Sequence, residues 1–274
     1  MSRRITIRGA SFNVDAGGDA SFSDIRGKRI RSFWEHACSG AWESESFAAI
    51  DRFCPPDAAF IDLGAWIGPL SLYAAARGAA VYSFEPDPAA CHKLKLNVAA
   101  NPTLNVEIQE KAVTRLGAAV TLYSEAAGDS QSSTFNLRER GGKVIKALPV
   151  CTATSVALQQ TLQRIARHHA RLFLKVDVEG GEYGLLEGLS ARDLSPVSHI
   201  CLSLHPENIV DGLRGDPEAA RSLRAAHSLK LVPLFKTCRI LRAGEHGWVD
   251  YAYTNIVEDI SKSGSPRTPL MLEL

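Results

Sequence analysis

Two strand-like segments of this chain lead directly into side chains that can transfer protons. The apolar run from Leu172 to Val176 is followed by Asp177 and Glu179. A second run, from His199 to Leu204, is followed by His205. Because the carboxyl ends of parallel strands meet at one edge of an open α/β sheet, these side chains should lie close together. We therefore predict that Asp177, Glu179 and His205 are the catalytic residues, acting in acid–base chemistry.

The same residues leave other chemistry open. Carboxylate oxygens are ligands that Mg²⁺ prefers, so Asp177 and Glu179 could also form half of a divalent-metal site. A histidine near its ordinary pKa is the usual proton acceptor, but nothing in the sequence ranks the three candidates. Glu182, later in the same turn, is interpreted as a structural cap of the helix that follows.

A glycine-containing turn follows another buried strand, from Ala58 to Leu63. The turn reads Gly64-Ala65-Trp66-Ile67-Gly68, and a helix pattern begins at Leu70. A strand, tight turn and helix in this order form a crevice that takes nucleotide-like cofactors. The dinucleotide pattern G-x-G-x-x-G is not met, because Trp66 and Pro69 stand where its second and third glycines would be. NAD and FAD are therefore disfavoured.

A second carboxylate supports a nucleoside cofactor. The short strand from Val81 to Phe84 ends in Glu85-Pro86. A carboxylate about twenty residues beyond such a turn can accept hydrogen bonds from both ribose hydroxyls. The turn alone would be a weak signal, but the turn and Glu85 together at this spacing are fairly specific.

These motifs resemble a known family. Asp62, Gly64 and Gly68 resemble motif I of the class I S-adenosylmethionine-dependent methyltransferases. More closely, the run from Lys175 to Glu182, K-V-D-V-E-G-G-E, is similar to the signature of the FkbM-type methyltransferases. Phe84-Glu85-Pro86, the L-x-x-N run from Leu94 to Asn97 and Gly128-Asp129-Ser130 fit the same family, and Trp66 departs from the Asn that many members carry.

The resemblance implies S-adenosylmethionine as cofactor and transfer of its methyl group to a hydroxyl oxygen of a sugar, polyketide or related metabolite. It implies a cofactor site in which Asp62 orients bound water or the methionine amino group. The cofactor-binding residues that we predict are Asp62, Gly64, Ala65, Trp66, Gly68, Glu85, Pro86, Asp129 and Ser130.

The acceptor is predicted to bind to an aromatic and acidic segment near the N-terminus. Trp34, Trp42 and Glu43 carry indole faces and a carboxylate, which suit a polyhydroxylated saccharide ring. A polyketide or peptide hydroxyl stays open as an alternative acceptor, as does a non-catalytic protein that only binds S-adenosylmethionine. Methylation of an amine or a nucleic-acid base is disfavoured, because the strand from Leu172 to Val176 ends in an acidic turn that does not resemble the N-P-P-Y-type turn of amino-methylating enzymes.

Composition excludes some partners. The 274 residues have a formal net charge of +1 and are 22% charged, so neither a nucleic acid nor a membrane surface is expected as a partner. A basic cluster at residues 26–31 is interpreted as a solvated helix face. The six cysteines form no C-x-x-C pair, which predicts reduced thiols in a cytoplasmic protein.

Strand and helix patterns alternate from Ala58 onward, as in a doubly wound α/β fold with a mostly parallel, Rossmann-like sheet. We predict an N-terminal extension over 1–57, a methyltransferase-like domain over 58–260 with an antiparallel hairpin insert at about 117–150, and a flexible tail over 261–274. Further expectations are a strand over 231–235 and a last, antiparallel strand over 247–256.

Overall fold

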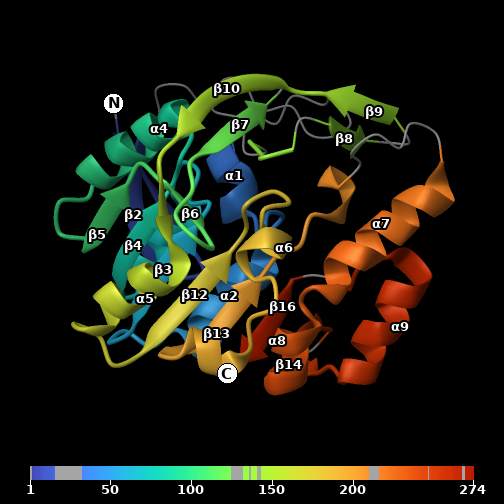
Figure 1. Ribbon diagram of the computed structural model, residues 1–274. Coiled ribbons are helices and arrows are strands. Elements are labelled where there is room, and N and C mark those ends of the chain that lie inside the picture. The colour runs from blue at the N-terminus through green and yellow to red at the C-terminus, as the bar shows by residue number, and fades with distance from the viewer. Residues whose placement is uncertain are drawn as a thin grey trace.

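An eight-stranded sheet forms the centre of the molecule (Figure 1). The computed structural model describes residues 2–15, 33–124, 132–135, 137–140, 143–209, 216–245, 247–266 and 269–274. Across the sheet the order is β15 (Gly247–Asp250), β14 (Arg239–Gly244), β16 (Leu270–Glu273), β13 (Val197–Leu202), β12 (Leu172–Val176), β3 (Ala59–Leu63), β4 (Ala80–Phe84) and β5 (Val106–Gln109).

The sheet is parallel from β13 to β5 and antiparallel at its other edge. β12 pairs with β13 on one side and with β3 on the other, both in parallel, and β16 joins β13 in antiparallel register. All five residues of β3 and of β12 are buried, as expected for parallel strands with helices on both faces. The doubly wound, mostly parallel fold predicted from the sequence is confirmed.

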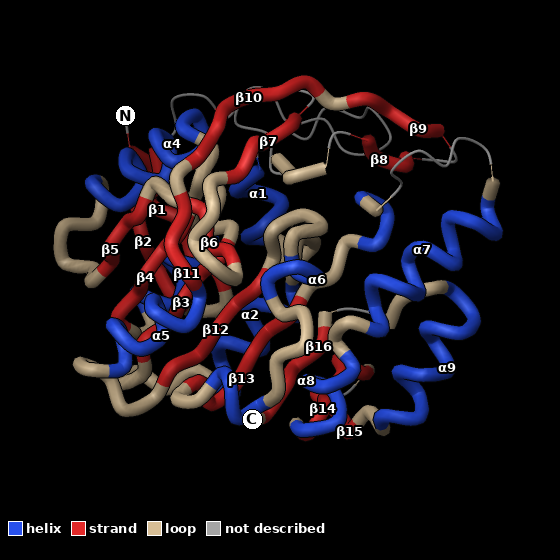
Figure 2. The backbone as a smooth tube through the Cα atoms, viewed as in Figure 1, coloured by secondary structure: helices blue, strands red, loops and turns tan. Residues whose placement is uncertain are grey.

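Helices cover both faces of this sheet (Figure 2). Phe60 and Phe173 point into one core with helices α1 (Phe33–Cys38), α2 (Ser44–Phe53), α3 (Pro69–Ala76) and α4 (Pro88–Ala99). Their neighbours Ile61 and Leu174 point into a second core with α5 (Leu158–Ala166), α6 (Glu182–Leu185), α8 (Val232–Thr237) and α9 (Tyr253–Ser263). Helix α7 (Pro217–Leu229) packs against α9. Successive side chains of a strand alternate between faces, so each central strand contributes to both cores.

The N-terminal hairpin is attached to the first of these cores. Strands β1 (Ser2–Ile7) and β2 (Ala10–Asp15) pair in antiparallel register, and Ile7 and Phe12 are buried there. The backbone of β2 donates to the side-chain oxygens of Asn97 and Asn101, each at 2.7 Å. These bonds hold the hairpin against the end of α4.

The antiparallel insert is present between β5 and α5. It comprises β6 (Ala112–Thr114), β7 (Val120–Ser124), β8 (Leu137–Arg140), β9 (Lys143–Lys146), β10 (Leu148–Ala153) and β11 (Ser155–Ala157). β7 pairs with β10 and β8 with β9 in antiparallel register, whereas β11 and β6 are parallel. In Figure 1 strands β7 to β10 cross the top of the molecule, on the side toward which β12 runs.

Three expectations for the C-terminal part are wrong. The end of the chain is not a flexible tail, because β16 lies inside the sheet between β13 and β14, with Leu270, Met271 and Leu272 fully buried. Residues 231–235 belong mainly to α8, since Leu231, Leu234 and Phe235 recur at helical spacing and are buried on one side. The range 247–256 divides into β15 and the start of α9.

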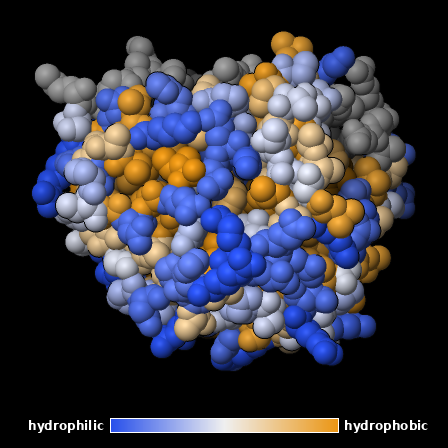
Figure 3. Space-filling model, turned by 60° about the vertical axis from the view of Figure 1, so that its left-hand side comes forward, coloured by the Kyte–Doolittle hydropathy of each residue, from blue (hydrophilic) through white to orange (hydrophobic). Residues whose placement is uncertain are grey.

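The surface is mixed in polarity. Figure 3 shows one face on which hydrophilic residues cover the lower half and hydrophobic residues gather in the upper half.

Within the described ranges, none of the helices combines the length and the apolar character needed to cross a bilayer. All six cysteines fall in described parts of the chain and are free thiols.

Candidate active site

A cavity of about 580 Å³ opens at the carboxyl ends of β3 and β12. The chain winds outward from β3 through β4 to β5 and then returns to place β12 on the other side of β3. Such a reversal of strand order is where open α/β sheets bind ligands, and the volume is typical of a small-molecule site. The turn after β3, the turn after β12 and the insert all contribute to its walls.

The two turn glycines are needed by the protein itself. Gly64 has φ +82°, and a Cβ there would lie 1.9 Å from the carbonyl oxygen of Asp177. Gly68 has φ +93°, and its Cβ would lie 2.5 Å from Leu94 Cδ1. Both positions thus require glycine because the turn packs closely on the turn after β12 and on α4.

Trp66 has a left-handed backbone conformation. Its φ is +50°, an unfavourable value for a bulky residue. The strain is offset by contacts: its N–H donates to Glu85 Oε2 at 2.7 Å, and its ring packs edge-on against Phe33 at 4.6 Å between centroids. Trp66 and Ala65 both line the cavity.

Glu85, for which the sequence predicts a role in ribose binding, is buried at the cavity wall beside Pro86. Its Oε1 accepts from the N–H of Asp87 at 2.8 Å, and its Oε2 accepts from Trp66. Burial raises the pKa of Glu85 to about 7, although these two hydrogen bonds act in the opposite direction. Each oxygen retains a lone pair, so the carboxylate can still accept ribose hydroxyls.

A buried lysine joins the turn after β3 to the turn after β12. Lys175 Nζ lies 3.2 Å from Asp177 Oδ2, 3.7 Å from Asp62 Oδ1 and 3.4 Å from the Gly64 carbonyl oxygen. Burial alone would lower the pKa of Lys175, but the charges of Asp177 and Asp62 outweigh it and raise that pKa. One signal for this role is visible in the sequence, a lone lysine inside an apolar run, but no function was predicted for it.

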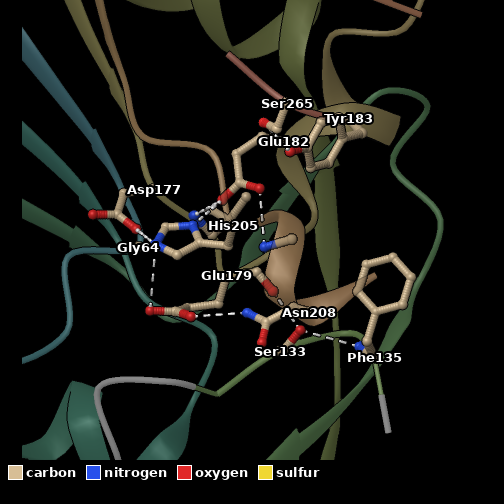
Figure 4. Close-up of polar contacts among 12 residues, drawn as sticks. Gly64, Ser133, Phe135, Asp177, Glu179, Glu182, Tyr183, His205, Asn208 and Ser265 are labelled. Carbon is tan, nitrogen blue, oxygen red and sulfur yellow. Dashed lines mark hydrogen bonds and ion pairs between the residues drawn. The ribbon is translucent and has the colours of Figure 1, made fainter. Parts of the chain in front are cut away.

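His205 lies among three carboxylates (Figure 4). Its Nε2 is 3.5 Å from Asp177 Oδ1 and 3.8 Å from Glu179 Oε1, while its Nδ1 is 3.0 Å from Glu182 Oε1. Burial opposes protonation, but the charge of Asp177 and the contact with Glu182 overcome it and raise the pKa of His205 to about 11. The imidazole is therefore protonated near neutral pH. It is a cation that holds carboxylates and not a ready proton acceptor.

Glu182 has the structural role that the sequence suggested and a further one. It is fully buried, and its carboxylate accepts from the N–H groups of Val178 and Gly180, each at 2.9 Å. These bonds close the turn after β12. The additional contact with His205 was not predicted, because strand β13 and this turn come together only in the folded chain.

Glu179 is held in a left-handed conformation, with φ +54°. Its Oε2 accepts from Asn208 Nδ2 at 3.0 Å, and its carbonyl accepts from the Ser133 hydroxyl of the insert. Burial raises the pKa of Glu179 to about 7, with His205 acting against this shift. By contrast, Lys175 and His205 outweigh the effect of burial on Asp177 and lower its pKa. Asn208 is a contributor that sequence reasoning missed.

The three predicted catalytic residues thus come together. Asp177, Glu179 and His205 each offer one ligand atom, and these atoms lie within 4.8 Å of one another. This arrangement could hold a divalent cation once the imidazole had lost its proton. Mg²⁺ therefore stays a prediction, with His205 added to the carboxylates that the sequence suggested.

Two of the three predicted acceptor residues lie at the cavity, and the third does not. Trp42 and Glu43 line the cavity, but Trp34 is 2% exposed and packs in the core against Phe12 and Phe33. The assignment of Trp34 to the acceptor site is wrong. The sequence alone does not distinguish an indole that fills a core from one that faces a ligand. Asp129, Ser130 and the basic cluster at 26–31 lie outside the described residues.

Comparison with models of known protein families identifies a match. Residues 62–208 match the model of the methyltransferase FkbM domain. This range begins at Asp62 and ends at Asn208, so it contains the turn after β3, Glu85, the insert and the turn after β12. No curated protein matches the chain.

Solved structures resemble the fold distantly. The S-adenosylmethionine-dependent methyltransferase from Agrobacterium tumefaciens is 16% identical, with a TM-score of 0.35, over 81% of this chain and 56% of that one. Precorrin 8W decarboxylase from Methanobacterium thermoautotrophicum is 14% identical, with a TM-score of 0.33, over 84% and 88%. The chain thus spans little more than half the length of the first of these proteins.

Proposed function

The chain belongs to the FkbM methyltransferase family, since the family model covers more than half of it; on that premise we propose that it transfers the methyl group of S-adenosylmethionine to a hydroxyl of a sugar or sugar-containing metabolite. The observation that carries this proposal is a single cavity that joins Glu85 and the turn after β3 to Asp177, Glu179 and His205. A nucleoside ligand and a proton-accepting group would meet there.

The residues present fit the cofactor. Glu85 is a buried acceptor suited to ribose hydroxyls. Oδ1 of Asp62 is buried and makes no hydrogen bond within the described chain, although Lys175 Nζ lies 3.7 Å away as an ion-pair partner. Carboxylates of the cavity lining can attract a ligand with a sulfonium and an ammonium group; they belong to Glu43, Asp62, Glu85, Asp177 and Glu179. When bound, S-adenosylmethionine supplies a methyl group that is strongly electrophilic.

The side chains of the turn after β12 would receive the acceptor's proton. As the hydroxyl oxygen forms its bond to the methyl carbon, the carbon–sulfur bond breaks and the hydroxyl proton must leave. Glu179 is the best-suited base, because its pKa of about 7 matches neutral pH and Asn208 holds its carboxylate in place. His205 orients Asp177 and Glu179 through charge.

A saccharide is proposed as the acceptor on the basis of the cavity wall. The Trp42 and Trp66 rings lie 6.5 Å apart between centroids and both line the cavity, as do the carboxylates of Asp177 and Glu179. Indole faces can pack on the C–H face of a sugar ring, and carboxylates can accept from its hydroxyls. This combination supports a polyhydroxylated acceptor over a wholly apolar one.

The test begins with calorimetric titration of S-adenosylhomocysteine and, in parallel, of NAD⁺. We expect binding of S-adenosylhomocysteine only, and a loss of affinity of about 10- to 100-fold in Glu85→Ala, because a charged hydrogen-bond acceptor is removed. Binding of NAD⁺ in place of S-adenosylhomocysteine would contradict the proposal.

Turnover is then measured with nucleotide-linked sugars as acceptors. Glu179→Gln should lower kcat by about 10²- to 10⁴-fold and leave S-adenosylhomocysteine affinity unchanged. Glu218→Gln is a matched control, since Glu218 lies on the surface beside Arg221. A protein that binds the cofactor and methylates no hydroxyl compound would instead be a non-catalytic binding protein.

A further inference from the structure

The cavity is lined by basic side chains as well as by the acids described above. They belong to Lys111, Arg115, His227 and Lys230. Arg115 follows β6 and Lys230 follows α7, so the fold brings cations from distant segments of the chain to one cavity. The acids of the cavity suit the cofactor and the transferred proton, but these basic side chains suit a part of a ligand that carries negative charge.

Arg115 and Lys230 meet at Gly188. A Cβ at Gly188 would lie 3.8 Å from Nη1 of Arg115. The N–H of Gly188 donates to the Lys230 carbonyl oxygen at 3.0 Å. One glycine thus adjoins both residues, and because both also line the cavity they form a pair of cations at its wall, here called the cation pair.

The cation pair is available to a ligand. No carboxylate of the described ranges forms an ion pair with Arg115. Asp193 interacts with its charge from further away, but the Asp193 carboxylate already accepts from the N–H and the hydroxyl of Ser190. Lys230 Nζ lies 3.3 Å from Glu187 Oε2, and both side chains are more than a third exposed. An exposed ion pair of this kind contributes little free energy, so a bound anion can replace it.

Helix α6 joins the acids to the cation pair. Glu182 begins α6 and contacts His205, and Gly188 lies three residues beyond the end of the helix. Between them, a Cβ at Gly184 would meet no atom within 4 Å, so this face of α6 borders open space. Gly184 itself lines the cavity. A ligand that lies along α6 therefore reaches the acids at one end and the cation pair at the other.

We propose that the acceptor carries a phosphate group, which Arg115 and Lys230 bind while the acceptor hydroxyl lies at Glu179. This proposal rests on the function proposed above and narrows its acceptor to a phosphorylated sugar, either a sugar monophosphate or a nucleotide-linked sugar. A guanidinium group can donate two parallel hydrogen bonds to a phosphate, and an ammonium group adds a compact positive charge. The two cations are thus specificity-determining residues.

The experiment uses pyrophosphate as the probe, because it carries the proposed group without the sugar. It is titrated by calorimetry into the protein saturated with S-adenosylhomocysteine. Arg115→Gln and Lys230→Gln should each weaken pyrophosphate by about 10-fold or more, since each removes a charged hydrogen-bond donor. Both variants should bind S-adenosylhomocysteine within about twofold of wild type. Lys262→Gln removes an exposed cation beside Glu258 on α9 and should change neither affinity.

Turnover distinguishes the two sources of phosphate. A panel of sugar monophosphates, a panel of nucleotide-linked sugars and a panel of uncharged sugars are offered as acceptors. One of the two phosphorylated panels should be methylated, and for that panel Arg115→Gln should raise KM about 10-fold and leave kcat within about twofold. Methylation of uncharged sugars alone would overturn the phosphate proposal and leave the proposed function in place.

The titrations can contradict the proposal in two further ways. Equal pyrophosphate affinity in wild type and both variants, or no pyrophosphate binding to the wild-type complex, would overturn it. Weaker S-adenosylhomocysteine binding in both variants would also overturn it, because the cation pair would then belong to the cofactor site. Failure of the wild-type protein to bind S-adenosylhomocysteine at all would instead overturn the proposed function.

Discussion

Lys175 and His205 place positive charge at the carboxyl ends of β12 and β13, and each is surrounded by acids. Lys175 faces Asp62 and Asp177, while His205 faces Asp177, Glu179 and Glu182. Asp177 is common to both groups, so the state of each cation affects the other. These residues are best understood as one charge network that determines which carboxylate is free to take a proton.

Removal of the buried lysine should damage stability as well as the site. Lys175→Met leaves the buried carboxylates of Asp62 and Asp177 without the ammonium group that they share. We expect a loss of about 3–5 kcal/mol in the free energy of unfolding, measured by urea denaturation at pH 7. Lys95→Met removes an exposed ion pair with Glu110 and should cost at most about 1 kcal/mol. Similar losses in the free energy of unfolding for the two variants would contradict the charge network described above.

Protonation of His205 should make stability depend on pH in a defined direction. Its pKa is raised to about 11 in the folded protein, above the ordinary value of 6.5. The folded state therefore binds this proton more tightly than the unfolded state. The resulting stabilisation is complete below about pH 6.5 and is lost as the pH rises toward 11.

The measurement compares wild type with His205→Gln by urea denaturation between pH 6 and pH 10. The wild-type advantage should be largest at pH 6 and should shrink steadily as the pH rises. An advantage that grows with pH would show that the imidazole is neutral in the folded protein, which would restore it as a candidate base.

At the scale of elements, β16 is the feature that the sequence concealed. Its burial between β13 and β14 predicts that the last residues are essential for folding. Leu272→Ala should lower the free energy of unfolding by about 2–5 kcal/mol, the usual cost of a cavity at a fully buried leucine. Leu229→Ala, at a position 57% exposed, is the control and should change it by less than about 0.5 kcal/mol. Equal changes in the free energy of unfolding for the two variants would indicate that the end of the chain is a mobile tail and not a strand of the sheet.

The parallel half of the sheet was predictable because each strand there carries its own signal. β3, β4 and β12 are short, mainly apolar runs followed directly by glycine or an acid, and helix patterns alternate with these runs along the chain. β16 has only four residues and follows a segment rich in Ser, Gly and Pro. Its pairing partners lie far away in sequence, so local pattern could not reveal that it enters the sheet.

The candidate site was predictable to the extent that its residues lie at strand ends. Glu85, Asp177 and His205 directly follow apolar runs, and Asp62 is the next-to-last residue of one. The structure places all four at the cavity. Lys175, Asn208 and the second contact of Glu182 depend on how separate turns pack together. The protonated state of His205 could not be foreseen either, because it arises from three carboxylates that meet only after folding.

At the scale of the whole molecule, the cavity lies where the two cores meet. Trp66 and Leu70 line it from the first core, and Leu63, Val113 and Tyr183 line it from the second. The central strands contribute side chains to both cores, which couples the two faces of the sheet. A ligand in the cavity therefore contacts residues from both halves of the packing and should stabilise them together.

Thermal unfolding with S-adenosylhomocysteine tests this coupling. A ligand that binds only the folded state at 100 times its Kd stabilises it by about 2.7 kcal/mol. For a chain of this size that corresponds to a rise in Tm of about 5–10 °C. We expect a single unfolding transition in calorimetry, both without and with the ligand. The ligand should raise the temperature of this whole transition, because the bound molecule contacts both cores. Two transitions of which only one moves would show that the cores unfold separately, and the cavity would then belong to one of them.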